Sequence, residues 1–352
     1  RVVEAMQPYF SGVFGNPGSL HRFGQEASAA VFEARRNIAD ALGSDYREII
    51  FTGSATEANN LAMRGSVRNV VDVVMRHYNK RVRTSDRTIT TLQPIRIIVS
   101  SIEHESILET AKDLKHQGVD VVYLPVSREG IVDLKKLEAS LNEHTILVSV
   151  MYANNEIGSI QSIAKIAEII RDFRNARNVG NVVMNDEGKR AKASDRTITT
   201  TTTLYPLFHT DAVQALQYLD CRVKDLGVDL MTISAHKIYG PKGIGALYVS
   251  KKLNVTSEKV VKNSISHSPF FISPIITGGG QENGLRSGTE NVSYIVGFGK
   301  AVELIIKLRE KEALRVGKLR DYLWENLKRI QPRVSLNGPQ TEKNRLPNNL
   351  NI

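Results

Sequence analysis

The 352-residue sequence has one cysteine, Cys221, so no disulfide can form within the chain. No apolar run approaches the roughly 18 residues that a membrane-spanning helix requires, and no secretory signal peptide opens the chain. These absences argue against a disulfide-stapled secreted domain and an integral membrane protein, and they are typical of a reducing, cytoplasmic compartment. With 41% hydrophobic and 24% charged residues, the length suits one large domain with an adjunct, or two domains.

Positive charge is concentrated in two stretches that share a repeat. Residues 76–96 carry a net charge of +5 and residues 171–206 a net charge of +3, together eight of the ten excess positive charges of the chain. The heptapeptide "SDRTITT" occurs at 85–91 and again at 194–200. We interpret these stretches, at about 76–94 and 175–206, as polar surface insertions. A nucleic-acid-binding arm is the alternative, although no interleaved aromatic residues indicate base stacking.

Around these insertions, strand and helix patterns alternate. Near-continuous apolar runs predict strands buried on both faces: 48–53, 95–101, 119–126, 145–153, 207–212, 229–235 and 245–250. Amphipathic patterns predict helices between them: 22–42, 56–69, 105–117, 133–141, 161–174 and 212–219. Such alternation predicts an α/β fold with a mostly parallel, seven-stranded sheet and helices on both faces. A long helical pattern follows Asn291, and the last residues suggest the start of a smaller α+β domain.

Polar motifs follow five of the predicted strands: "TGSATEANN" (52–60), "SIEHES" (101–106), "ANNEIG" (153–158), "HTDAVQ" (209–214) and "SAHKIYGPKG" (234–243). Ligands of parallel sheets bind at the carboxyl ends of the strands. The helix beginning at Ala55 and Thr56 offers free N–H groups for an anion, although an ordinary capping turn has the same pattern. A strand-end Asp211 needs a cationic partner or several donors if it is buried, and a desolvated Lys237 can attack a carbonyl as a neutral amine.

Five further residues extend this set. Ser234 and His236 flank Lys237 with donors suited to a phosphate, and His104 offers a flat ring that could stack on a heteroaromatic cofactor. Asn155 could donate to a ring hydroxyl, and Gln214 lies one helical turn after Asp211. A lone strand-end histidine is more often structural. Together, however, the motifs supply what pyridoxal 5'-phosphate needs from a protein.

The motif order "SATE … EH … NNEIG … HTDAVQ … SAHKIYGPKGIGALYV … GGGQENGLRSGTEN" resembles that of the cysteine desulfurases of the NifS/IscS-like class. These are fold-type I pyridoxal-phosphate enzymes of the class V aminotransferase group. The resemblance runs over nearly the whole chain and is interrupted by the two insertions. The lysine of "GPKG" and the "GGGQE…RSGT" block favour this class over the related sulfur-mobilisation class.

The resemblance implies a role for each motif. Lys237 would hold the cofactor covalently, and Asp211 would pair with its ring nitrogen. Gln214 and Asn155 would contact the ring hydroxyl or its surroundings, and His104 would stack on the ring and move protons. The phosphate would be held by four residues of this chain and one of the neighbouring subunit: Ala55, Thr56, Ser234, His236 and the neighbour's copy of Thr289. The site would therefore belong to a homodimer, and no metal ligand is assigned.

The sequence departs from the family pattern at three places. The segment that precedes "RVVEAMQPYF" in the family is absent, and the chain stops before the loop with the nucleophilic cysteine and the arginine that clamps the substrate carboxylate. Cys221 does not match the catalytic position and is expected to be structural. Ser54 stands where the family commonly has glycine. The expected domains are a small one including residues 1–11, a large cofactor-binding one over 12–305, and an incomplete small one over 306–352.

The function implied is conversion of L-cysteine to L-alanine, with a persulfide sulfur passed to an acceptor protein such as an iron–sulfur scaffold, or used in tRNA thiolation. Another class V enzyme, an aminotransferase or a selenocysteine lyase, would use the same lysine. A catalytically incompetent cofactor-binding fragment is a third possibility, given the missing segments. No membrane partner is expected, and nucleic acid is the weakest of the alternatives.

Overall fold

In the computed structural model, the described residues are 1–82, 94–180, 205–253 and 272–352. Seven strands form one sheet in the order β1-β7-β6-β5-β4-β2-β3. In chain order they are β1 (Ile49–Thr52), β2 (Arg96–Ser100), β3 (Asp120–Leu124), β4 (Thr145–Ser149), β5 (Leu207–Asp211), β6 (Leu230–Ser234) and β7 (Gly245–Val249). Among the described strands, β7 runs opposite to the other six, so the predicted mostly parallel α/β sheet is confirmed.

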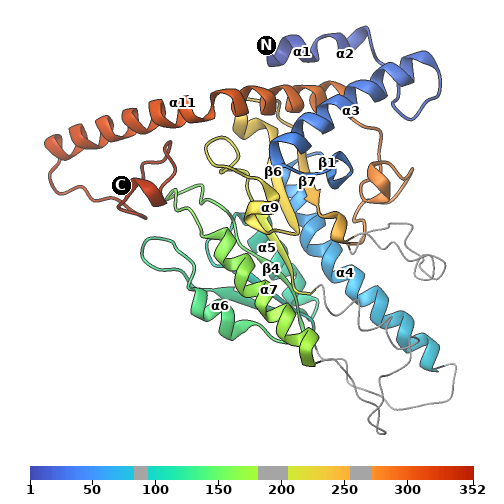
Figure 1. The fold of residues 1–352 in the computed structure, drawn as a ribbon, viewed down its shortest axis with the longest axis horizontal. Coiled ribbons are helices and arrows are strands. Elements are labelled where there is room, and N and C mark those ends of the chain that lie inside the picture. Colours follow the sequence, from blue (N-terminus) through green and yellow to red (C-terminus); the bar gives the residue numbers. More distant parts are fainter. Residues whose placement is uncertain (83–93, 181–204, 254–271) are drawn as a thin grey trace.

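Helices connect and cover these strands (Figure 1). The longer ones are α3 (Arg22–Leu42), α4 (Ala55–Val82), α5 (Glu105–His116), α7 (Ile163–Gly180) and α11 (Val292–Ile330). Shorter helices are α1 (Val2–Met6), α2 (Pro8–Ser11), α6 (Leu134–Ser140) and α9 (Val223–Leu226). The described residues also form five 3-10 turns: η1 (Tyr46–Glu48), η2 (Ala235–Ile238), η3 (Lys251–Leu253), η4 (Glu282–Gly284) and η5 (Glu342–Asn344).

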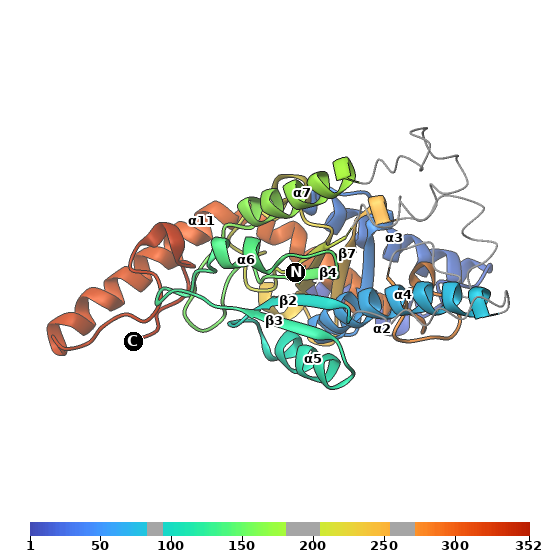
Figure 2. The same cartoon turned by 90° about the horizontal axis from the view of Figure 1, so that it is seen from below.

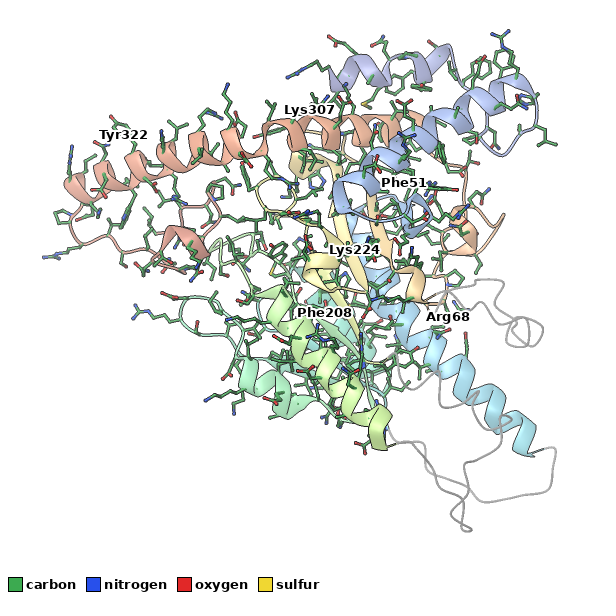
Figure 3. The ribbon with its side chains drawn as sticks, in the orientation of Figure 1. Phe51, Arg68, Phe208, Lys224, Lys307 and Tyr322 are labelled. Carbon is green, nitrogen blue, oxygen red and sulfur yellow. The ribbon has the colours of Figure 1, made fainter. Side chains whose placement is uncertain are left out.

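The sheet has a separate apolar core on each face. Alternate strand residues point to opposite faces, so Ile50 packs with α4 and α5, whereas its neighbour Phe51 packs with α3, α7 and α11. Figure 2 shows α7 and α5 on opposite sides of the strands. Phe208 is fully buried near the middle of the sheet, while Tyr322 lies on the far part of α11, where it is exposed (Figure 3).

Strand register brings the polar motifs to one edge of the sheet. Ser149 of β4 lies opposite His209 of β5, and Asp211 lies opposite Thr232 of β6. Two residues further along β6, Ser234 lies opposite Gly245 of β7, which also faces Thr52 at the end of β1. The turns that follow β1, β2, β4, β5 and β6 therefore all open on the same edge.

Two expectations differ from the structure. The segment 212–219 forms consecutive turns, not a helix, because the chain must return within a few residues to start α9. Helices α4 and α7 continue to Val82 and Gly180, so the first residues of both expected insertions are helical. Residues 83–93 and 181–204, which include both "SDRTITT" copies, lie outside the described residues.

Candidate functional site

Asp211 is the buried charged group at the centre of this edge, with 5% of its surface exposed. Its Oδ2 accepts a hydrogen bond from Asn59 Nδ2 at 2.8 Å, and its Oδ1 accepts one from the Val213 N–H at 2.9 Å. Burial raises its pKa, while these two bonds and the positive charges of His104 and Lys237 act to lower it. The carboxylate thus interacts with two residues, His104 and Lys237, that lie in the turns after two other strands.

Lys237 lies in the turn η2 that directly follows β6. Its side chain is exposed in the single chain, so the strand end does not by itself desolvate the amine. The reason is local: η2 buries Ala235 and Ile238 and turns the two residues between them outward. The amine nevertheless acts electrostatically on Asp211.

Ser234 and His236 flank this lysine as predicted. Ser234 is buried, and its Oγ lies 2.9 Å from His236 Nδ1. The pKa of His236 is lowered, first by partial desolvation and then by the positive charges of Lys237 and Lys242. The turn therefore has a positive potential and hydrogen-bond donors, which together suit an anion.

His104 caps the N-terminus of α5 and is exposed. Its Nδ1 accepts the Ser106 N–H at 3.1 Å and lies 2.9 Å from Ser106 Oγ. This capping role was not expected from the sequence. The capping bond holds the ring through Nδ1, and the second ring nitrogen, Nε2, takes no part in it.

The turn between β1 and α4, where an anion site or an ordinary capping turn was expected, has a capping hydrogen bond. Ser54 Oγ accepts the Glu57 N–H at 3.1 Å, and Thr56 is exposed next to Ala55 in the first turn of α4. The non-glycine residues of the described chain with positive φ are Tyr239, Glu282 and Asn283, so serine is accommodated at position 54 without backbone strain.

Gly245 allows this turn to approach the sheet. A Cβ at position 245 would lie 2.7 Å from the Ser54 carbonyl carbon and 2.8 Å from the Ala55 nitrogen, closer than real Cβ contacts permit. Gly245 also pairs with Ser234, the residue before the turn of Lys237. The absence of a side chain at position 245 therefore determines how closely the N-terminus of α4 approaches that turn.

Asn155 and Gln214 are placed at the same edge. Asn155 is exposed, and the neighbouring Asn154 shapes its turn by accepting the N–H groups of Glu156 and Ile157 at 2.9 Å. Gln214 is half-buried in the turn after Asp211. Gln214 is close to Asp211 in sequence and Asn155 follows the neighbouring strand β4, but no described contact assigns either of them a role.

Thr289 is exposed at the end of a segment held by two ion pairs. Arg35 forms a bidentate pair with the buried Glu282, with N–O distances of 2.6 and 2.7 Å. Arg286 Nε donates to Glu57 Oε1 at 2.8 Å, and Glu57 also accepts the Gly53 N–H. This second pair ties the "RSGT" segment to the first turn of α4.

Sequence reasoning missed three buried polar residues at this edge: Asn59, Glu103 and Ser106. Glu103 Oε1 accepts from Ser100 Oγ at 2.5 Å and from the Met151 N–H at 2.7 Å, while its Oε2 has no hydrogen-bond partner. Burial raises the pKa of Glu103 to about 8. The sequence did contain a signal, because all three residues lie inside the strand-end motifs. The functional roles were, however, assigned to other residues of the same motifs, such as Thr56 and His104.

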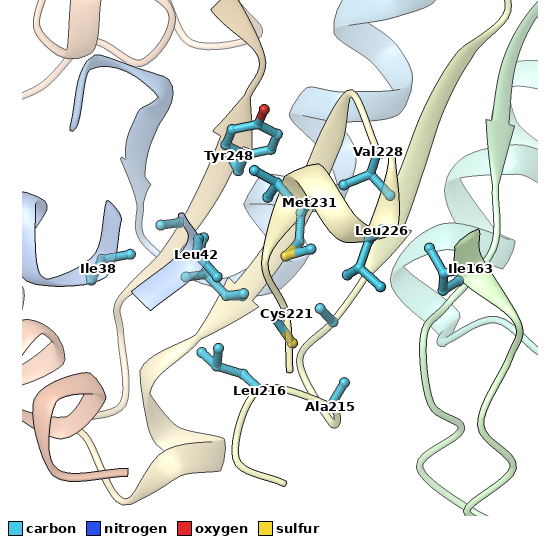
Figure 4. Close-up of a cluster of buried hydrophobic side chains, with 14 of the residues drawn as sticks. Ile38, Leu42, Ile163, Ala215, Leu216, Cys221, Leu226, Val228, Met231 and Tyr248 are labelled. Carbon is cyan, nitrogen blue, oxygen red and sulfur yellow. The ribbon is translucent and has the colours of Figure 1, made fainter. Parts of the chain in front are cut away.

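Cys221 is fully buried, in agreement with its expected structural role. It packs among apolar side chains that include Leu216 and Leu226, as the close-up shows (Figure 4). Burial raises the pKa of the thiol to about 12. A protonated thiol inside a core is a poor nucleophile.

Taken together, the edge offers a buried carboxylate, a lysine amine, an imidazole and a helix N-terminus. This donor set fits pyridoxal 5'-phosphate: the carboxylate can pair with a protonated ring nitrogen, and the helix N-terminus with a phosphate. Within the described residues, no three His, Cys, Asp or Glu side chains lie together in a way that could hold a metal ion. No helix among those residues is long and apolar enough to span a bilayer.

Comparison with known proteins supports the same family. The aminotransferase class-V model matches residues 1–76, 88–183 and 200–352. The chain is 40% identical over all 352 residues to the cysteine desulfurase IscS of Dictyoglomus turgidum, of which it covers 72%.

Two solved structures are similar along most of the chain. One is a NifS-like protein, with 32% identity, a TM-score of 0.74, and coverage of 99% of this chain and 77% of that one. The other is SspA in complex with cysteine, with 34% identity, a TM-score of 0.62, and coverage of 86% and 68%. The chain belongs to the aminotransferase class-V family.

Proposed function

We propose that this member of the aminotransferase class-V family is a pyridoxal-phosphate-dependent cysteine desulfurase. The observation that carries the proposal is the buried Asp211 carboxylate at a strand end, held by Asn59 and interacting electrostatically with Lys237 and His104. The cysteine desulfurases to which the chain is similar, and the related SspA, whose structure contains cysteine, suggest L-cysteine as substrate.

The residues of the edge divide the binding of the cofactor among them. Lys237 would hold its aldehyde carbon, and Asp211 its ring nitrogen. The phosphate would lie at the N–H groups of Ala55 and Thr56, with donors from Ser234 and His236. Asn155 and Gln214 are proposed to contact the ring hydroxyl or its surroundings.

When bound, the cofactor supplies a protonated ring that accepts the electron pair left at the substrate α-carbon. Asp211 keeps the ring nitrogen protonated, because a buried carboxylate is stabilised by an adjacent positive charge. Lys237, when its amine is free, would be placed to carry the α-proton of the substrate. His104, with one ring nitrogen fixed by Ser106, is proposed as the stacking group and a second proton carrier.

The same proposal includes a homodimer. Exposed apolar side chains gather between α2 and α3: Phe10 is 55% exposed, Phe14 70% and Leu20 91%, and the rings of Phe14 and Phe23 stack at 5.7 Å. A second copy could cover them. Thr289, at the end of its ion-paired segment, would then reach the phosphate of the neighbouring subunit.

The finer assignments are a sulfur-acceptor protein such as an iron–sulfur scaffold, and a cytoplasmic location. No sulfur-accepting role is assigned to Cys221, because its thiol is buried. Isolation of persulfide-labelled partners from cells and fractionation of the cell contents would test these assignments.

Visible absorption tests the cofactor assignment. The purified protein should be yellow after incubation with pyridoxal 5'-phosphate, and Lys237→Ala should abolish the absorption band and the cofactor's resistance to dialysis. Lys242→Ala is the matched control, because it removes a nearby positive charge from the same segment and leaves the reactive amine. An unchanged band in Lys237→Ala would refute the assignment.

The substrate is tested in a chain extended at its C-terminus through the loop that carries the family's nucleophilic cysteine, by measuring the alanine and sulfide formed from L-cysteine in the presence of a thiol reductant. Equal release of both products is expected of a desulfurase. Formation of an oxo acid without sulfide would indicate an aminotransferase, and turnover restricted to selenocysteine would indicate a lyase.

A further inference from the structure

Four side chains at the candidate site form a continuous hydrogen-bonded chain, and two of them have no role in the function proposed above, on which this inference rests. Asn59 Nδ2 lies 2.8 Å from Asp211 Oδ2 and 2.8 Å from Ser106 Oγ. Ser106 Oγ lies 2.9 Å from His104 Nδ1. The chain thus joins the end of β5 to the start of α5 through α4.

The direction of each hydrogen bond follows from its two ends. The Asp211 carboxylate can only accept, so the amide NH2 of Asn59 must face it. The same NH2 donates its second hydrogen to Ser106 Oγ, which therefore turns its own hydrogen to His104 Nδ1. The Ser106 backbone N–H, which can only donate, also points at that nitrogen. His104 Nδ1 is consequently an acceptor, and the neutral ring carries its proton on Nε2.

The amide of Asn59 is held in this orientation at a cost. Asn59 is fully buried, and its Oδ1 has no hydrogen-bond partner, which proteins normally avoid. Flipping the amide would place that oxygen against the carboxylate of Asp211 and would break both donated bonds. The unpartnered oxygen indicates that the two donated bonds determine how the side chain lies.

We propose that Asn59 and Ser106 are positioning residues that couple the ionised carboxylate of Asp211 to the imidazole of His104. A negative charge on Asp211 orients Asn59, Asn59 orients the Ser106 hydroxyl, and the hydroxyl keeps the imidazole proton on Nε2. The nitrogen of His104 not used in capping is then the one that can give a proton at the site. The group that holds the ring nitrogen and the group that stacks on the ring thus act as one unit.

Nitrogen NMR of the cofactor-free protein tests the coupling without any catalytic activity. In protein labelled with ¹⁵N-histidine, His104 is assigned by the signals lost in His104→Gln. Wild type should show an unprotonated Nδ1 and a protonated Nε2. Asn59→Leu, which does not touch His104, should shift the Nδ1 signal, and the shift should be at most about half as large when Ser106→Ala is also present.

Rates in the cofactor-loaded protein give a second readout. Exchange of the α-hydrogen of L-alanine with deuterated water reports proton transfer without requiring sulfur chemistry. Asn59→Leu and Ser106→Ala should each slow exchange roughly threefold to tenfold, the range expected for one lost hydrogen bond, with little change in the half-saturating alanine concentration. Asn59 and Ser106 act on His104 through the same series of hydrogen bonds, so either substitution alone already breaks it. Exchange in the double variant should therefore be no slower than in the slower single variant.

Controls separate coupling from a general loss of structure. Ser106→Thr keeps the hydroxyl and should restore both the Nδ1 signal and the exchange rate. Asn69→Leu changes another asparagine of α4, whose Nδ2 bonds to Tyr205 instead, and should leave His104 unaffected.

The proposal is refuted if His104 carries its proton on Nδ1. It is also refuted if Asn59→Leu shifts Nδ1 equally with and without the Ser106 hydroxyl, or if the two rate effects multiply in the double variant. A protein that binds no cofactor would overturn the proposed function instead, and the cofactor-free NMR result would still decide whether the chain of bonds exists.

Discussion

Replacing Glu103 with glutamine should make the protein more resistant to alkaline conditions. The carboxyl is buried beneath the site, where its Oε1 accepts two hydrogen bonds and its Oε2 has none. Burial raises its pKa from 4.5 to about 8. The group is therefore mostly protonated near neutral pH, and the amide of glutamine closely resembles this neutral form.

The expected magnitude follows from proton linkage. Between pH 4.5 and 8 the folded chain binds more protons at Glu103 than the unfolded chain does, so the free energy of unfolding decreases as the pH rises through this range. The accumulated loss is about 3 kcal/mol at pH 7 and approaches about 5 kcal/mol above pH 8. Glu103→Gln lacks this loss, so the free energy of unfolding of the variant relative to wild type should increase by similar amounts.

Urea unfolding of the cofactor-free protein, followed by tryptophan fluorescence at a series of pH values from 5 to 9, measures this difference. Glu105→Gln, which removes a negative charge from the exposed neighbour in the first turn of α5, corrects for the loss of one charge. If the difference in free energy of unfolding between Glu103→Gln and wild type were the same at every pH, the reasoning would be contradicted. It would mean that the carboxyl has the same pKa in the folded and unfolded chains.

Three further changes have expected outcomes. His209 is buried between Ser149 and Thr232, and burial lowers its pKa to about 3. Below pH 6.5 the unfolded chain therefore binds more protons than the folded chain, and the free energy of unfolding should fall by about 2 kcal/mol at pH 5. His209→Gln should lose this acid sensitivity in urea titrations. Cys221→Ser places a hydroxyl in an apolar core and should lower the free energy of unfolding by roughly 1–3 kcal/mol, while the cofactor absorption stays unchanged; loss of the band would contradict a purely structural cysteine. Arg286→Ala should release the segment 278–290 from α4, seen as faster proteolytic cleavage there at unchanged far-ultraviolet dichroism, and Arg315→Ala, which breaks an exposed pair with Glu312, should not.

Much of the fold was predictable because burial on both faces leaves a direct trace in the sequence. The strand runs at 145–153 and 229–235 were recognised from continuous apolar residues, and helix α3 was predicted at its observed bounds of Arg22–Leu42. The segment 212–219 misled because its apolar residues reach the core from consecutive turns as well as they would from a helix.

The site was predictable in its membership but not in its internal bonds. Which strand ends meet follows from a parallel sheet, and Asp211 and Lys237 were found in that way. The bridge from Asn59 to Ser106, which are 47 positions apart in the sequence, depends on how α4 and α5 pack, and no local sequence pattern predicts that contact. The exposure of Lys237 depends on how η2 distributes four residues between core and solvent, which the strand pattern before it does not specify.

The pairing of β7 has a mechanical consequence. Gly245 lies opposite Thr52 on one side and Ser234 on the other, so the strand ends leading to the phosphate cradle and to the lysine turn rest on the same residue. A flexing of the sheet would carry both along together and keep the gap between them constant. The distance between the phosphate cradle and the lysine turn, which a bound cofactor must match, is thus set by the adjacent strands β1, β7 and β6. It does not depend on movements of the outer helices.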